Sequence, residues 1–196
     1  MLPLLIIFSY LMGSIPSGYI LVKKKLNKDV REYGSGNIGA TNVRRVAGEN
    51  LSKITAICDM LKAIIPVLLT RILIWNDILK TNESLSLSLV AIAAILGHNY
   101  TIFLKFKGGK GVATSAAAFM IVVPIPFLIT AVIFFGLKLV TKIVSIRSLV
   151  AATTLFLSTL LLGYDKYYVY ATLFACLLVF WRHKSNIVRL IKGEEK

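Results

Sequence analysis

Long apolar stretches dominate this sequence and restrict what it can fold into. The first of them, LPLLIIFSYLMGSIPSGYILV, is followed directly by a cluster of lysines. A helix needs roughly 20 apolar residues to cross the hydrocarbon core of a bilayer, and several of the stretches approach that length. We therefore predict an all-α integral membrane protein with several crossings. The apolar runs cover residues 2–22, 52–76, 85–104, 112–137, 148–163 and 166–181.

The composition supports this prediction. Hydrophobic residues make up 57% of the chain and charged residues 16%, whereas a soluble domain is roughly half apolar and about a quarter charged. The 196 residues suffice for one domain, so we expect 1–196 to form a single membrane domain. Residues 1–22 lack the basic start of a signal peptide. Cys58 and Cys176 lie in apolar runs, which predicts small core residues rather than disulfide partners or metal ligands.

The formal net charge of +14 requires a cause in so apolar a chain. Nucleic-acid binding is one source of such charge, but the basic residues lie in loops between the runs rather than in one tail. That distribution points to the positive-inside rule together with anionic ligands or lipid head groups. The first loop is therefore predicted to be cytoplasmic, with the N-terminus outside. Its cations are Lys23, Lys24, Lys25, Lys28, Arg31, Arg44 and Arg45.

The same rule requires a reversal within residues 112–137. The short loop 76–84 is nearly neutral and is expected outside, whereas the basic stretch 105–114, the loop around Lys142 and the C-terminal tail are expected inside. Residues 112–137 must then begin and end on one side, and Pro124 and its neighbour Pro126 mark the turn. Two pieces of about 12 residues reach roughly 18 Å each, short of a ~30 Å core.

Three explanations of this short length stay open: a locally thin bilayer, helices that extend further, or a re-entrant hairpin. The alternative is one proline-kinked span with the next loop outside. Counting both pieces, we predict seven short transmembrane helices with the C-terminus in the cytoplasm. Four polar, glycine-bearing loops then share the cytoplasmic face and can form one site. They are 27–50, 105–114, 141–148 and 182–194.

The first of these loops, YGSGNIGATNVRR, has the residue types of an anion site. Its glycines allow tight turns that expose backbone N–H groups, and Arg44 and Arg45 add charge, so the loop can surround an anion with donors. The alternative is a glycine- and asparagine-rich connector. Its uncharged hydrogen-bonding side chains are Ser35, Asn37, Thr41 and Asn42.

The second loop, FKGGKG, combines lysine with glycine as phosphate-binding loops do. It lacks the GxxxxGK[ST] spacing of a Walker A loop, and a flexible basic loop is the alternative. The candidate phosphate ligands are Lys107, Gly108, Gly109, Lys110 and Gly111, with the glycines acting through backbone N–H groups.

The remaining two loops give weaker signals. Ser145 and Ser148 offer hydroxyls, although a helix N-cap is the alternative. His183, Asn186 and Arg189 recur at i, i+3 and i+6 and share one side of a short helix. An interfacial amphipathic helix is the alternative there.

A few charged residues fall within the apolar runs. Asp59 and Lys62 stand at i and i+3, which predicts a structural ion pair. Arg71 is expected to extend outward to the interface. His98 is expected to pack between helices rather than to act in catalysis.

Together these motifs resemble the bacterial membrane glycerol-3-phosphate acyltransferases that use acyl phosphate, the PlsY family. The resemblance implies transfer of a fatty acyl group from acyl phosphate to the 1-hydroxyl of glycerol 3-phosphate. The products would be 1-acyl-glycerol 3-phosphate (lysophosphatidic acid) and inorganic phosphate, in the first acylation step of phospholipid synthesis. The motifs are GSIPSGYI (13–20), GSGNIGATN with Arg45 (34–45), Asp59 with Lys62, GH and FLKFKGGKGVAT (97–114), Ser145 with Ser148, and RHKSNIVRLIKGEE (182–195).

The resemblance also implies roles for single residues. Ser35 and Arg45 would be an essential pair, Lys110 would bind phosphate, and His183 and Asn186 would orient a reactant. Glu194 would be structural. His183 is the natural candidate for a general base, but a phosphate with a second pKa near ~6 can accept the proton itself. We therefore expect substrate-assisted transfer.

The implied partners are acyl phosphate, glycerol 3-phosphate and membrane lipids. We expect no metal, no cofactor and no nucleic acid, and a monomer in the bacterial inner membrane with its active site on the cytoplasmic face. Two competing interpretations are a transporter or channel for a phosphorylated small molecule and a non-catalytic anchor for anionic lipids.

Overall fold

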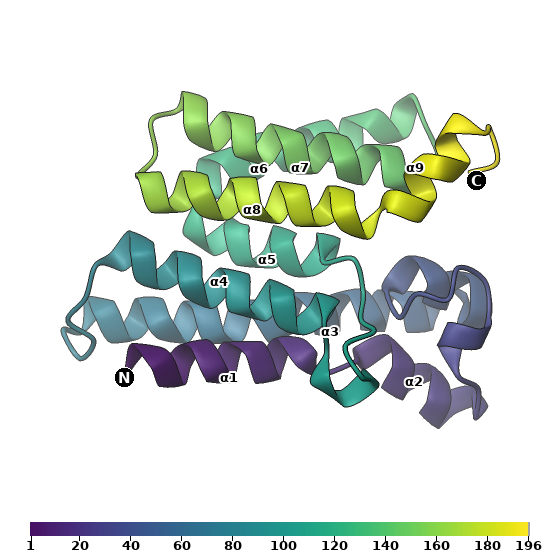
Figure 1. Ribbon diagram of the computed structural model, residues 1–196, viewed down its shortest axis with the longest axis horizontal. Coiled ribbons are helices and arrows are strands. Elements are labelled where there is room, and N and C mark those ends of the chain that lie inside the picture. The colour runs from purple at the N-terminus through teal and green to yellow at the C-terminus, as the bar shows by residue number, and fades with distance from the viewer. Residues whose placement is uncertain (196) are drawn as a thin grey trace.

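The structure is a computed structural model that describes residues 1–195, and within this range it contains helices and no strand (Figure 1). Short 3₁₀ turns connect some of the longer helices: η1 (Val30–Glu32), η2 (Ile102–Leu104) and η3 (Leu137–Leu139). The α-helices are α1 (Leu2–Ser14), α2 (Ser17–Leu26), α3 (Ala40–Trp75), α4 (Glu83–Asn99), α5 (Val112–Val122), α6 (Pro124–Gly136), α7 (Val144–Leu161), α8 (Lys166–Arg182) and α9 (Lys184–Ile191).

Two boundaries differ from the sequence prediction. The run 2–22 is two helices, because Pro16 forces Ile15 into an extended conformation (ψ 114°) and ends α1. The second difference is α3, which begins at Ala40 rather than at residue 52 and bends at Gly48 (φ 83°). The start of α3 is polar and carries no long apolar run, so apolar length does not predict that it is helical.

The predicted reversal at Pro124 is present. Val123 has extended backbone angles and Pro124 takes the first helical position of α6, where a missing N–H costs nothing. In Figure 1, α5 runs away from the glycine–lysine loop and α6 returns toward the same end. Ser145, at the start of α7, contacts Glu195 in the C-terminal segment. The alternative of one kinked span, with residue 145 at the far end, is therefore wrong.

The exterior of the bundle suits lipid. Within residues 1–195, three stretches are long and apolar enough to cross a membrane, namely Leu2–Leu26, Glu83–Leu104 and Val144–Leu161. Val112–Val122 and Pro124–Leu139 are shorter apolar helices. One face of α3 exposes a regular row of large apolar side chains, as expected of a surface against hydrocarbon. The row consists of Ile54, Ile57, Leu61, Ile65, Leu68, Ile72 and Trp75.

The opposite face of α3 is buried and partly polar. Asp59 and Lys62 form the predicted ion pair, with 2.9 Å between Oδ1 and Nζ. His98, near the end of α4, is buried, as the sequence suggested. Its Nδ1 lies 3.7 Å from a carboxylate oxygen of Asp59, a proximity that the sequence did not indicate. Arg71 does not simply extend into the interface: it donates a hydrogen bond of 2.7 Å to the carbonyl of Ile121 and lies 3.6 Å from a carboxylate oxygen of Glu83.

The connections of the bundle separate into two ends. Figure 1 shows the α2–α3 connection, the glycine–lysine loop, the α6–α7 connection and α9 at one end. The N-terminus and the α3–α4 and α7–α8 connections lie at the other. The four loops that the sequence assigned to one face therefore do share one end of the molecule.

Candidate functional site

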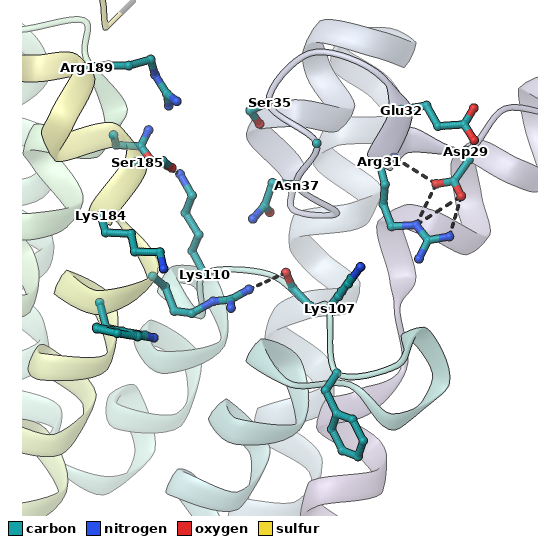
Figure 2. Close-up of a pocket in the computed structure, with 16 residues that line it drawn as sticks. Asp29, Arg31, Glu32, Ser35, Asn37, Lys107, Lys110, Lys184, Ser185 and Arg189 are labelled. Carbon is teal, nitrogen blue, oxygen red and sulfur yellow. Dashed lines mark hydrogen bonds and ion pairs between the residues drawn. The ribbon is translucent and has the colours of Figure 1, made fainter. Parts of the chain in front are cut away.

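The loop-bearing end contains a cleft of about 600 Å³. Three segments far apart in the sequence line it: parts of 29–37, of 106–110 and of 181–189 (Figure 2). A smaller cleft of about 370 Å³ lies between Gly34, Ser35 and Arg45 on one side and residues near the C-terminus on the other. Ser35 and Arg189 line both clefts. The two clefts are therefore adjacent.

Cations outnumber acids in the wall of the larger cleft. Its two acids are Asp29 and Glu32, and Asp29 is already engaged by the guanidinium of Arg31, with 2.6 Å between Oδ2 and Nη2. Low-dielectric walls of one sign raise the local concentration of opposite charge, so this cleft is suited to an anion. The cations are Arg31, Lys107, Lys110, Arg182, Lys184 and Arg189.

The first loop owes its shape to Asn42. The side-chain oxygen of Asn42 accepts a hydrogen bond of 2.8 Å from the backbone N–H of Ser35, and its amide nitrogen donates to the carbonyls of Val30, Tyr33 and Asn37. Asn42 is 1% exposed. The sequence suggested it as a phosphate ligand, but the structure uses its amide to build the loop that presents Ser35.

Positive φ angles at Gly34 (60°) and Gly36 (68°) allow this loop to turn so tightly. A side chain at Gly34 would also collide with Asn42, because a Cβ there would lie 2.3 Å from Oδ1. Asn37 lines the larger cleft, and its side-chain oxygen accepts a bond from the N–H of Gly39.

The glycines of the second loop do not act as predicted. The N–H of Gly108 donates to the carbonyl of Asn99 at 3.2 Å, and the N–H of Gly109 donates to the carbonyl of His98 at 2.9 Å. Both N–H groups therefore cap the end of α4 instead of pointing toward a phosphate. A Cβ on Gly108 would lie 2.1 Å from the His98 carbonyl oxygen. Glycine is needed here because the loop packs directly against α4.

Gly111 has a related role. Its φ of 82° is left-handed, and a Cβ there would lie 2.7 Å from the side-chain oxygen of Asn99. It is buried at the N-terminal boundary of α5. Gly108 and Gly111, at the two ends of the glycine–lysine loop, thus both allow close packing against the end of α4.

Arg182 was missed by the sequence analysis. Its Nε donates to the carbonyl of Gly109 at 2.9 Å and its Nη2 to the carbonyl of Gly108 at 2.8 Å. Its guanidinium carbon also lies 5.2 Å from the centroid of the Tyr100 ring, within the distance of a cation–π contact. Arg182 thus fastens α8 to the loop and adds charge to the cleft.

Lys110 and Asn186 meet at the centre of a hydrogen-bond chain. The ammonium of Lys110 donates to the side-chain oxygen of Asn186, whose nitrogen donates to Glu195. Burial lowers the pKa of Lys110 to about 8, although the nearby carboxylate of Glu195 acts in the opposite direction. A phosphate that binds beside Lys110 would restore the charge that burial disfavours.

Glu195, rather than Glu194, holds the C-terminal segment. Its carboxylate accepts bonds from Ser145 at 3.1 Å and from Arg189 at 2.6 Å, in addition to that from Asn186. Burial acts to raise the pKa of Glu195, but these hydrogen bonds outweigh it and hold the pKa below its ordinary value. The smaller cleft lies against this carboxylate.

His183 is buried between α8 and α9. Its Nδ1 lies 2.8 Å from the carbonyl of Val179, which assigns the proton to that nitrogen and leaves Nε2 as an acceptor. Burial, reinforced by the charge of Lys110, lowers the pKa of His183 to about 4. His183 is therefore neutral near pH 7 and a weak base.

The remaining candidates are dispersed. Thr41 is exposed on the first turn of α3. Ser148 is buried and donates to the carbonyl of Val144, four residues back in its own helix, so it stands apart from the cleft. Among residues 1–195, no group of three or more His, Cys, Asp or Glu side chains is arranged to hold a metal ion.

Comparison with known proteins gives consistent relatives. Residues 3–193 match the family model described as glycerol-3-phosphate acyltransferase. A glycerol-3-phosphate acyltransferase of Clostridium acetobutylicum is 47% identical over 191 residues, which is 97% of this chain and 96% of that protein. One from Staphylococcus haemolyticus is 42% identical over 201 residues, covering 100% and 96%.

Two solved structures share the fold. They are crystal structures of PlsY, an integral membrane glycerol 3-phosphate acyltransferase, in a glycerol 3-phosphate form and a lysophosphatidic acid form. The first has a TM-score of 0.91 at 35% identity and the second 0.86 at 34%, and each match covers 100% of this chain and 94% of the other. With its apolar exterior, the protein is embedded in a membrane, and the chain belongs to the glycerol-3-phosphate acyltransferase family.

Proposed function

We propose that this protein transfers a fatty acyl group from acyl phosphate to the 1-hydroxyl of glycerol 3-phosphate. The products are 1-acyl-glycerol 3-phosphate and inorganic phosphate. The observation that carries the proposal is the cation-lined cleft where Ser35, Lys110 and Asn186 come together from three segments. The family membership and the glycerol 3-phosphate and lysophosphatidic acid forms of the solved relatives support the acceptor and the product.

The two reactants explain the residue types at the site. Each carries a phosphate, and the larger cleft offers six cations against two acids. The acyl donor also carries a hydrocarbon chain, and the cleft lies at the end of apolar helices that can receive it. Ser35 and Arg189 line both clefts, so phosphates held in the two would lie close to each other. Proximity of this kind contributes to rate by removing the entropy cost of encounter.

The reaction then needs one displacement. The 1-hydroxyl oxygen of glycerol 3-phosphate attacks the acyl carbonyl carbon, and the bond from that carbon to the bridging phosphate oxygen breaks. The hydroxyl proton passes to the departing phosphate, which has a second pKa near ~6. The cationic side chains stabilise the negative charge that develops on the carbonyl and phosphate oxygens.

Roles for the site residues follow from the resemblance and the geometry. Ser35 and Arg45 act together at the smaller cleft, and Arg182, Lys107 and Lys110 hold phosphate in the larger. Asn186 holds Lys110 in place. His183 positions α9 as a neutral residue and is not the base, in keeping with its lowered pKa.

The arrangement of the chain in the membrane is part of the proposal. We propose seven crossings, with α1 and α2 together forming the first, the N-terminus outside and the cleft at the cytoplasmic face of a bacterial inner membrane. The excess of lysine and arginine at the loop-bearing end supports this orientation. The chain acts as a single-domain monomer that needs no metal or other cofactor.

A direct assay tests the reaction. Purified protein is mixed with palmitoyl phosphate and glycerol 3-phosphate, separately and together, and phosphate release is followed. Release that depends on both substrates supports the proposal. Movement of glycerol 3-phosphate into vesicles without phosphate release would contradict it and indicate a transporter.

A further inference from the structure

A cluster of buried charged and polar side chains lies beneath the glycine–lysine loop, outside both clefts. In α3, the ion-paired Asp59 and Lys62 are 5% and 3% exposed. The imidazole Nδ1 of His98, in the last turn of α4, lies 3.7 Å from the same Asp59 oxygen that binds Lys62. Ionisable groups in a membrane bundle are costly and tend to pair or to serve a site. The proposed chemistry uses none of these three residues.

His98 lies directly against the loop that carries Lys110. Its carbonyl accepts the N–H of Gly109 at 2.9 Å. A Cβ built on Gly109 would lie 1.9 Å from Nε2 of the His98 ring and 2.5 Å from its Cε1, so the ring is in contact with the glycine. Gly109 immediately precedes Lys110. The ring therefore packs against the backbone immediately before Lys110.

The cluster is fixed to the elements on both sides of the loop. On the near side, His98 ends α4. On the far side, Thr114 in the first turn of α5 donates a hydrogen bond of 3.1 Å to the carbonyl of Asp59. Lys62 donates a bond of 3.0 Å to the carbonyl of Ile15, at the break between α1 and α2. One turn of α3 thus meets both flanks of the loop, because the Asp59 carbonyl binds Thr114 and the Asp59 carboxylate lies 3.7 Å from Nδ1 of His98.

We propose that His98, which lies beside Asp59, is a positioning residue. Its ring packs against Gly109 and thereby fixes the position of Lys110 in the cleft. The proposal rests on the function proposed above. His98 touches neither reactant and acts through the backbone of the loop. Without the ring, the loop can shift and capture of a phosphorylated reactant weakens, whereas the displacement itself is affected less. The expected signature is a raised KM with a nearly unchanged kcat.

Two neighbouring glycines provide a matched test. A methyl group on Gly109 collides with the His98 side chain, whereas one on Gly108 collides with the backbone carbonyls of His98 and Asn99. His98→Ala removes the side chain with which a methyl group on Gly109 collides. It leaves in place the backbone carbonyls with which a methyl group on Gly108 collides. We would measure kcat and KM for both substrates in five variants. They are His98→Ala, Gly109→Ala, Gly108→Ala and the two double variants that combine each glycine change with His98→Ala.

The expected result is rescue of one glycine variant alone. His98→Ala raises KM for glycerol 3-phosphate or acyl phosphate about tenfold with kcat within about threefold of the wild type. Gly109→Ala lowers kcat/KM further, and adding His98→Ala restores it at least about tenfold, a coupling that contacting residues show and independent ones do not. Adding His98→Ala to Gly108→Ala gives no restoration.

Additive losses in the Gly109→Ala, His98→Ala double variant would overturn the proposal, as would a loss in His98→Ala confined to kcat. If His98→Ala does not purify as a folded protein, His98→Gln takes its place, because the flexible glutamine can move away from a methyl group at 109. An inactive wild type would refute the proposed function instead. Hydrogen exchange then still tests the contact. We expect His98→Ala to speed amide exchange in 105–111 and to leave the exchange rate in 76–82 unchanged. An equal change of the exchange rate in both segments would contradict the contact.

Discussion

Lys110 donates a hydrogen bond to the side chain of Asn186, a residue 76 positions further along the chain. This contact joins the glycine–lysine loop to α9, and Asn186 extends it to Glu195 and from there to Ser145. Three of the four loops that the sequence grouped on one face are thereby linked by side-chain contacts.

Replacing Lys110 should remove the cation that is central to this network. We expect Lys110→Met to lower kcat/KM by about a hundredfold or more, as loss of a charge-stabilising group at a reacting centre does. Phosphate release from palmitoyl phosphate measures it. The matched control is Lys105→Met, which changes an exposed lysine of the same loop outside the larger cleft. Equal activity in the two variants would contradict the role given to Lys110.

The lowered pKa of Lys110 predicts a pH dependence. With a pKa of about 8, the free enzyme loses this charge as the pH rises through 8, and an anionic reactant then binds less well. We expect kcat/KM to fall on the alkaline side of about pH 8, because kcat/KM reports groups of the free enzyme. In Lys110→Arg the falling limb should move upward, since guanidinium keeps its proton. An unchanged alkaline limb in that variant would assign the titration to another group.

His183→Gln tests the absence of a protein base. Because burial lowers the pKa of His183 to about 4, we expect the variant to keep a kcat within about tenfold of the wild type, less than general bases commonly contribute. The wild-type rate profile should show no inflection near pH 6.5 from this residue. A loss of activity that added imidazole restores would instead identify His183 as the base.

The planar guanidinium of Arg182, with its two donors, should be needed for full activity. Because it donates to two successive carbonyls, at Gly109 and Gly108, a lysine at this position can satisfy one of them at a time. We expect Arg182→Lys to lower kcat/KM about tenfold, the effect of one such hydrogen bond to a charged group. Arg44→Lys, at an exposed position of α3, is the control and should behave as the wild type.

The buried ion pair should matter for stability far more than an exposed one. Asp59→Asn leaves Lys62 unpaired inside the bundle, which costs about 3–5 kcal/mol. Glu49→Gln breaks a contact of 3.9 Å with Lys53 in the same helix, where both side chains are more than half exposed, and costs about 0–1 kcal/mol. Thermal unfolding in detergent compares the two. Similar Tm values for both variants would show that the buried pair is dispensable.

Much of the fold could be predicted because lipid imposes simple rules. Apolar length marked most of the long helices, and the distribution of lysine and arginine required a reversal that Pro124 supplies. The start of α3 could not be found in this way, because Ala40 begins a polar stretch whose helicity depends on packing against α2 and the first loop. The break between α1 and α2 follows from Pro16, which disfavours helical angles at Ile15, but apolar length alone does not reveal it.

The site was predictable where residue type alone decides the role. Lys110 and Asn186 line the cleft as charge and hydrogen-bonding capacity suggested. The glycines were misassigned because a glycine N–H serves either a phosphate or a neighbouring helix end, and only the position of α4 decides between them. Arg182 was missed because its partners are carbonyls 73 and 74 residues away, which leave no trace in the local sequence.

The most direct test of the account follows the bridging oxygen of the acyl donor. Palmitoyl phosphate that carries ¹⁸O at the oxygen bridging the acyl carbon and phosphorus would be incubated with glycerol 3-phosphate and the purified protein. We predict equal amounts of 1-acyl-glycerol 3-phosphate and inorganic phosphate, with the label only in the phosphate. Label retained in a lipid product, or phosphate release without acylated product, would contradict the proposed displacement at the acyl carbon.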